Sequence, residues 1–112
     1  MPDATAYKIL LPDEWAALTR DGSFAGAAVD VADGFIHMST AAQLDETLRK
    51  HFAGRDELWI AAIDLAALGD LVRWEPSRGG ALFPHLYGEL PLSAVVAHGP
   101  LAQQEDGSVR LP

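Results

Sequence analysis

Residues 33–54, DGFIHMSTAAQLDETLRKHFAG, carry the clearest structural signals of this chain. In the second part of this stretch apolar side chains recur at positions i, i+4 and i+8, which predicts an amphipathic helix over residues 40–54. Thr40 and Gln43 have the spacing of a capping box at its start, and the glycine at its end suits the C-terminal cap. The preceding residues 35–39, FIHMS, predict a short strand. A strand that leads directly into a helix is therefore the starting point for the fold.

The rest of the chain predicts one further helix and several strands. The helix is expected over residues 12–20, where Pro12 suits the first turn because an N–H at this position has no partner within a helix. Loops are expected over residues 21–34 and 76–81, which are rich in Gly, Ala, Ser and Asp and show no sustained period. Strands are expected over residues 5–11, 57–65, 71–75 and 94–101, with a short last strand after a turn at residues 105–109.

Residues 82–90, LFPHLYGEL, predict an irregular segment or an edge strand, because Pro84 cannot donate a hydrogen bond to a ladder. Two main helices thus come early in the chain and most strands come later. The connections are too short for repeated parallel crossovers, which favours a mixed or antiparallel sheet. We therefore expect a single α+β domain over residues 1–112.

Charge and composition exclude several classes of function. Sixteen Asp and Glu against eight Lys and Arg give a net charge of −8, which repels phosphate backbones and anionic lipid headgroups. An extended nucleic acid and a membrane are therefore not expected partners, whereas a small nucleotide held by local contacts is compatible with this charge. The absence of cysteine excludes thiol catalysis. With neither a secretion signal nor an apolar run of roughly 18 residues, we expect a cytoplasmic protein.

His37 is the first candidate site residue, because an imidazole in an apolar strand needs a partner for each ring nitrogen. In an extended segment the side chains of Phe35, His37 and Ser39 project to one side. One interpretation makes His37 a hydrogen-bonded core residue and Ser39 the end of the strand. The other places both residues at a ligand site.

A second aromatic and polar group follows later in the chain. Phe83, His85 and Tyr87 would share one side of an extended segment, so that together with the first group they could line one pocket. An aromatic wall with a few hydrogen-bonding groups suits a planar polar ligand such as a nucleobase or nicotinamide. The structural alternative is an edge loop in which Phe83 fills the core and Tyr87 bonds back to the main chain.

Glu75 is the candidate carboxylate at the rim of this pocket, where it could stabilise a developing positive charge. Alternatively, Glu75 forms a surface pair with Arg73, and Glu89 is the rival carboxylate. We interpret His51 as structural, on the flank of the helix at residues 40–54. The histidines do not have the spacing of a zinc motif, so we assign no metal site.

The segments DGFIHMSTAAQ, HFAG, LVRWE and FPHLYGELPL, with YKIL near the start, make the chain resemble the DUF952 family of small bacterial proteins over nearly its whole length. The resemblance implies a split sheet similar to that of the ADP-ribosyltransferase superfamily. In that superfamily a strand histidine with a hydroxyl residue two positions later holds NAD, an aromatic ring stacks on nicotinamide, and a glutamate often activates the reaction. His37 and Ser39 match the first motif, and Tyr87 or His85 could occupy the position of the aromatic residue or of a second histidine.

The resemblance implies a catalytic pair and a set of substrate contacts. His37 and Glu75 would be catalytic, although Glu89 lies where the acid of the superfamily is expected. The contacts to the substrate would come from Ser39, Phe83, His85 and Tyr87. NAD would be the substrate, for ADP-ribosyl transfer or NAD cleavage. One alternative is a non-catalytic module that binds a small metabolite or a side chain of a protein partner, and a third hypothesis makes both histidine motifs structural. The sequence leaves the reaction and the oligomeric state open.

Overall fold

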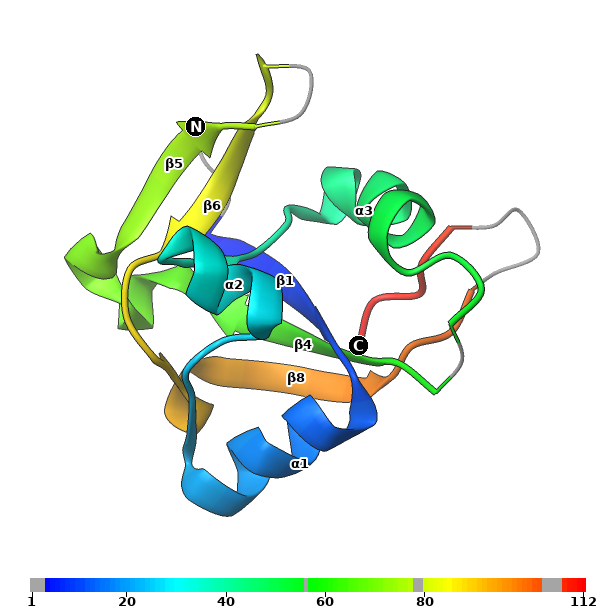
Figure 1. Ribbon diagram of the computed structural model, residues 1–112, viewed down its shortest axis with the longest axis horizontal. Coiled ribbons are helices and arrows are strands. Elements are labelled where there is room, and N and C mark those ends of the chain that lie inside the picture. The colour runs from blue at the N-terminus through cyan, green and yellow to red at the C-terminus, as the bar shows by residue number, and fades with distance from the viewer. Residues whose placement is uncertain (1–3, 56, 78–79, 104–107) are drawn as a thin grey trace.

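The computed structural model describes residues 4–55, 57–77, 80–103 and 108–112, and in these residues it has the predicted α+β architecture (Figure 1). A three-stranded antiparallel sheet has the order β1-β4-β8 and a second three-stranded sheet the order β3-β6-β5, while β2 and β7 form a two-stranded pair. The strands of the first sheet are β1 (Thr5–Leu10), β4 (Trp59–Asp64) and β8 (Val95–Pro100). Those of the second are β3 (Ile36–His37), β6 (Leu82–Leu86) and β5 (Val72–Pro76). The small pair consists of β2 (Ser23–Phe24) and β7 (Leu90–Pro91).

Three α-helices accompany these sheets in the described residues: α1 (Pro12–Asp21), α2 (Ala28–Asp33) and α3 (Leu44–His51). Short 3₁₀ turns precede α3 and several strands, at Ala41–Gln43, Leu65–Ala67, Gly69–Leu71 and Leu92–Ala94. None of the helices in the described ranges is long and apolar enough to span a membrane.

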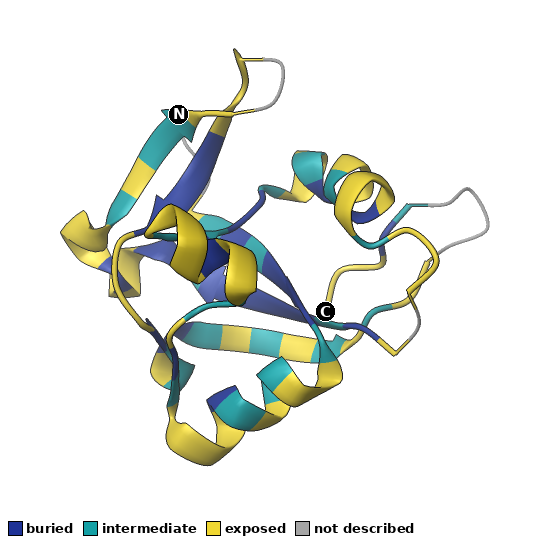
Figure 2. Ribbon diagram, in the orientation of Figure 1, coloured by how far each residue is buried: buried dark blue, intermediate teal, exposed yellow. Residues whose placement is uncertain are grey.

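The core is divided between the two sides of β1 and β4. On one side α3 packs its buried Leu44 and Leu48 against Ile9 and Ile60, as its i, i+4 pattern predicted. On the other side a larger cluster joins residues of β1, α1, β3, β4 and β6. Figure 2 shows burial concentrated along β1, β4 and β6. The β3-β6-β5 sheet is thereby anchored through its middle strand.

Both helices and most of the strands expected from the sequence are confirmed. The helix at residues 40–54 begins as the 3₁₀ turn and continues as α3, and the side chain of Gln43 accepts a hydrogen bond from the Thr40 N–H at 3.0 Å, which is one half of the capping box. Gly54 has a φ of 76°, a conformation that favours glycine. Pro12 is the first residue of α1, as predicted.

The loop predicted over residues 21–34 was wrong, because this segment contains β2 and the six-residue helix α2. Such a short helix shows too few turns for an apolar period to be read from the sequence. It is held instead by the Asp30 carboxylate, which accepts a hydrogen bond from the Ala27 N–H at 2.8 Å, and by Gly34 at its C-terminal cap with a φ of 90°.

The irregular or edge segment predicted over residues 82–90 was also wrong, because β6 is the central strand of its sheet. The Pro84 carbonyl accepts a hydrogen bond from the Met38 N–H at 3.1 Å, just past the end of β3. Since the N–H and C=O of a strand residue point to the same neighbour, the missing N–H of Pro84 also faces this end of β3 and breaks no bond between β5 and β6. Proline is therefore compatible with a central strand here.

Two sequence predictions fall partly outside the described residues. The turn at residues 105–109 lies mostly in residues 104–107, and the loop at residues 76–81 includes residues 78–79. In place of the predicted last strand, the described residues show a single antiparallel bridge between Gln103 and Val109.

Candidate functional site

The β3-β6-β5 sheet brings the two predicted histidines together. His37 on β3 lies opposite His85 on β6, and their ring centroids are 5.4 Å apart. The ring of Phe35 stacks on His85 at 4.1 Å and lies 4.6 Å from the ring of His37. The Tyr87 ring lies 5.3 Å from that of Phe35. We call Phe35, His37, His85 and Tyr87, together with Glu75, the histidine cluster.

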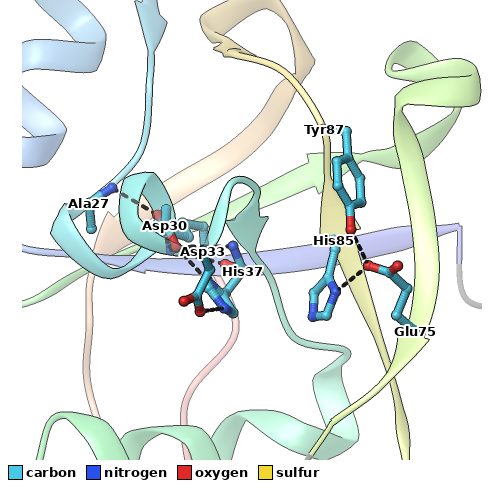
Figure 3. Close-up of polar contacts among 8 residues, drawn as sticks. Ala27, Asp30, Asp33, His37, Glu75, His85 and Tyr87 are labelled. Carbon is cyan, nitrogen blue, oxygen red and sulfur yellow. Dashed lines mark hydrogen bonds and ion pairs between the residues drawn. The ribbon is translucent and has the colours of Figure 1, made fainter.

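Glu75 on β5 joins the cluster through two hydrogen bonds to one of its oxygens. Its Oε1 accepts from His85 Nδ1 at 2.8 Å and from the Tyr87 hydroxyl at 2.8 Å (Figure 3). The hydrogen bond from His85 first, and then that from Tyr87, lower the pKa of Glu75 below its usual value. The hydrogen bond from Tyr87 to Glu75 raises the pKa of Tyr87, because the phenol loses the donated proton when it ionises. Glu75 is therefore a carboxylate at neutral pH.

His85 is held in one orientation by this contact. A carboxylate only accepts hydrogen bonds, so the proton of the His85–Glu75 bond lies on Nδ1. The His85 residue is 4% exposed, and its Nε2 has no partner among the described residues. A buried ring nitrogen of this kind needs a hydrogen-bond partner that the described part of the chain does not supply.

His37 is held by a second, deeper network. Asp30 is 1% exposed, and its Oδ1 accepts from His37 Nδ1 at 2.7 Å and from the His37 N–H at 3.1 Å. Its Oδ2 accepts from Lys8 Nζ at 3.0 Å, and Lys8 also donates to the His37 carbonyl at 2.9 Å. Burial alone would raise the pKa of Asp30, but the Lys8 ammonium and the hydrogen bonds from His37 and Ala27 outweigh it and lower the pKa.

The other nitrogen of His37 faces a second carboxylate. His37 Nε2 lies 3.0 Å from Oδ2 of Asp33, the last residue of α2 (Figure 3). A neutral imidazole has one N–H and can donate to only one of these aspartates, whereas an imidazolium donates to both. Neither ring nitrogen of His37 is thus open to a ligand while Asp33 stays in place.

The structure does not bring every predicted site residue into these contacts. The Ser39 hydroxyl bonds the hydroxyl of Thr47 on α3 at 2.9 Å, away from the histidine cluster. Phe83 is buried on β6 opposite Glu75. Glu89, the rival of Glu75, bonds the Ser23 hydroxyl at 3.1 Å. Glu75 is therefore the carboxylate that lies beside the histidines.

Sequence reasoning assigned no role to Lys8, Asp30 and Asp33, and it placed Phe35 only on the same side as His37. One signal was present, because Lys8 lies among apolar residues in the strand predicted over residues 5–11. A buried lysine requires an acidic partner, but the sequence does not say which of the 16 acidic residues provides it.

Two cavities lie near the surface, and neither is lined by His37 or His85. The larger, of about 680 Å³, lies between the end of α3 and the segment after β8. The smaller, of about 360 Å³, adjoins the cluster, because Asp30, Gly34, Phe35 and Gly88 help to line it. In the described ranges, no three His, Cys, Asp or Glu side chains are placed to share a metal ion.

Comparisons with known proteins match the chain to one family and to solved structures of one protein. The model of a family described as "Protein of unknown function (DUF952)" matches residues 9–98. The crystal structure of protein CC0527 from Caulobacter crescentus is 45% identical, with 95% of this chain and 93% of that chain covered and a TM-score of 0.86. The solution NMR structure of CC0527 is 46% identical, with 96% and 91% covered and a TM-score of 0.80. No curated protein matches the chain.

Proposed function

This chain belongs to the DUF952 family, and we propose that it binds NAD or a related nucleotide at the histidine cluster and catalyses ADP-ribosyl transfer or NAD cleavage. The observation that carries the proposal is His85, whose ring is oriented by Glu75 and whose buried Nε2 has no partner among the described residues. A histidine oriented by a carboxylate is a common arrangement for a general base.

The aromatic residues supply the surface that a nicotinamide or adenine ring needs. Phe35 lies within 5.3 Å of the rings of both His85 and Tyr87, and Tyr87 is partly exposed. The guanidinium of Arg73 lies 5.2 Å from the Tyr87 ring centroid, which adds a cation to this side of an acidic chain. The planar base and the negatively charged phosphates of a nucleotide fit this combination of rings and charge.

The proposed reaction uses two of these side chains. The bond between the ribose C1′ and nicotinamide breaks, and nicotinamide leaves with the bonding electrons. The ionised Glu75 stabilises the positive charge that develops on the ribose. A water or acceptor hydroxyl forms the new C1′–O bond, and its proton passes to Nε2 of His85. His37 stabilises the ligand-binding side of the cluster, and Ser39 and Phe83 support β3 and β6 behind it.

We extend the proposal to the fold family. Separate antiparallel sheets with the orders β1-β4-β8 and β3-β6-β5, with the histidines on the second, support a split sheet of the ADP-ribosyltransferase type.

The test is NAD turnover by the purified chain. We expect NAD to raise the melting temperature and nicotinamide to be released. His85→Ala and Glu75→Gln should each lower nicotinamide release by about 10²–10⁴-fold, the usual contribution of a positioned base. His51→Ala is the matched control, because His51 is exposed at the end of α3, outside the β3-β6-β5 sheet that carries the cluster. If NAD neither stabilises the protein nor is turned over, the proposal fails.

A second candidate is a binding module without catalysis. It is favoured by the low exposure of His85 and by the contact of His37 Nε2 with Asp33, which leave little reactive surface at the cluster. This candidate predicts saturable binding of NAD without nicotinamide release, and the same assay separates the two.

A further inference from the structure

The two carboxylates that contact His37 are held very differently. Asp30 is fully buried and accepts hydrogen bonds from Lys8, from the Ala27 N–H and from both the ring and the N–H of His37. Loss of any of these partners would leave a buried charge or donor unpaired, which is strongly unfavourable in the interior of a protein. The contact between Asp30 and His37 Nδ1 is therefore a permanent part of the fold.

Asp33 has none of these anchors. Its side chain is 47% exposed, and its contact with His37 Nε2 is the one recorded for its carboxylate in the described residues. As the last residue of α2, Asp33 also places a negative charge at the C-terminal end of the helix, where the helix dipole disfavours negative charge. Exposed ion pairs of this type contribute little to stability, so a competing anion can replace the carboxylate at little cost.

The side chain of His37 is partly exposed, and its partner at Nε2, Asp33, is itself half-exposed. The His37 side chain is 33% exposed, whereas that of Asp30 on the other nitrogen is 0% exposed. The cavity of about 360 Å³ is lined by neither His37 nor Asp33, so it does not supply the approach. A group that replaces Asp33 at Nε2 would approach directly from solvent, because Asp33 is half-exposed.

We propose that Asp33 is a displaceable partner of His37. Its carboxylate occupies the position at Nε2 where a phosphate oxygen of the ligand binds, while Asp30 and Lys8 hold the ring in place. A carboxylate and a phosphate oxygen are both anionic acceptors, so the exchange keeps the same donor pattern on the imidazole. The ligand class is an oxyanion of the phosphate type. The identification of this oxyanion as part of NAD rests on the proposed function. The existence of a phosphate site at His37 does not depend on it.

The experiment measures binding of inorganic pyrophosphate, inorganic phosphate and NAD to the full chain and to Asp33→Ala. If Asp33 occupies Nε2 for about nine-tenths of the time, its removal should tighten pyrophosphate binding about tenfold, because the competent fraction rises from one-tenth to one. Asp33→Asn keeps the size of the side chain and should also tighten the binding of pyrophosphate. NMR spectra of the ring nitrogens should place the effect of pyrophosphate on Nε2 of His37 and leave Nδ1 nearly unchanged.

Asp13→Ala is the matched control for charge. It removes one exposed carboxylate from α1, where Asp13 has no recorded contact with the cluster, and should leave the affinity for pyrophosphate within about twofold because salt screens exposed charges.

The outcomes separate this inference from the proposed function. Tighter binding of pyrophosphate to Asp33→Ala, with no binding of NAD, supports the oxyanion site and overturns NAD as its ligand. NAD turnover by the full chain, with equal pyrophosphate binding in both proteins, overturns the role of Asp33 and leaves the proposed function standing. Absence of pyrophosphate binding to either protein, or an effect at nitrogens other than Nε2 of His37, also overturns the inference.

Discussion

His37 and His85 face each other across the β3–β6 ladder, with ring centroids 5.4 Å apart. This pairing brings two motifs that are far apart in the sequence into one cluster. Imidazoles buried and more than about 10 Å apart, too far to contact one small ligand, would have favoured the hypothesis that both motifs are purely structural. That hypothesis also expected main-chain partners for the rings, whereas the rings contact the carboxylates of Asp30, Asp33 and Glu75. Neither observation favours it.

The buried ion pair between Lys8 and Asp30 leads to a prediction on stability. Asp30→Ala leaves the Lys8 ammonium buried without its partner and should lower the free energy of unfolding by about 3–5 kcal/mol. Adding Lys8→Met removes the unpaired charge, so the double variant should recover part of this loss. Urea unfolding of the three proteins measures both effects, and a double variant that is less stable than Asp30→Ala would contradict the explanation.

The lowered pKa of Asp30 predicts acid sensitivity. A carboxyl whose pKa is lower in the folded state than in the unfolded state binds more protons when unfolded, so it stabilises the fold above its unfolded pKa of about 3.9. This stabilisation is complete at neutral pH and is lost as the pH falls through the lower, folded value. Urea unfolding at a series of pH values below 5 should therefore show a weaker loss of stability in the double variant Lys8→Met, Asp30→Asn than in the natural chain.

The hydrogen bond between Tyr87 and Glu75 predicts coupled titrations. Glu75→Gln removes the carboxylate that raises the pKa of Tyr87, so this pKa should fall toward its ordinary value near 10. In the reverse experiment, Tyr87→Phe should raise the pKa of Glu75, although the bond from His85 remains. NMR titration of each group measures these shifts, and independent titration of the two side chains would show that the contact is absent in solution.

Phe35 provides a test of the aromatic surface. Under the proposed function Phe35→Leu keeps an apolar side chain but removes the ring that stacks on His85, at a distance of 4.1 Å between centroids. Aromatic pairs contribute about 0.5–1.5 kcal/mol, so binding of NAD should weaken about two- to tenfold. Calorimetric titration gives the affinity, and Phe24→Leu, which alters an aromatic residue of β2 in the core, is the control for general loss of packing.

Gly26 tests how tightly Asp30 is enclosed. A Cβ at this position would lie 2.8 Å from Cβ of Asp30, and the φ of 123° already disfavours other residues. Gly22 also has a positive φ, of 77°, but a Cβ there meets nothing within 4 Å. Gly26→Ala should therefore destabilise the chain by about 1–3 kcal/mol more than Gly22→Ala, the usual cost of overpacking. Equal losses in thermal unfolding would show that Asp30 has room to move.

Much of the fold could be predicted from residues that interact with near neighbours in the chain. The spacing of Leu44, Leu48 and Phe52 predicted α3, and Pro12 marked the start of α1, because helix periodicity and terminal preferences depend on contacts within a few residues. The alternation of side chains also predicted that Phe35 lies beside His37 and that His85 and Tyr87 share a side, where both bond Glu75. These features, and with them the resemblance to the family, were determined by the sequence alone.

Only the tertiary structure decided which side chains become partners. It placed β6 at the centre of a sheet despite Pro84, chose Glu75 over Glu89 as the carboxylate beside the histidines, and directed the Ser39 hydroxyl to Thr47. Above all, it joined Lys8, Asp30 and His37 from three separate elements into one buried network. A buried charge must be matched by an opposite charge in space, and local propensity carries no information about which distant segment brings it.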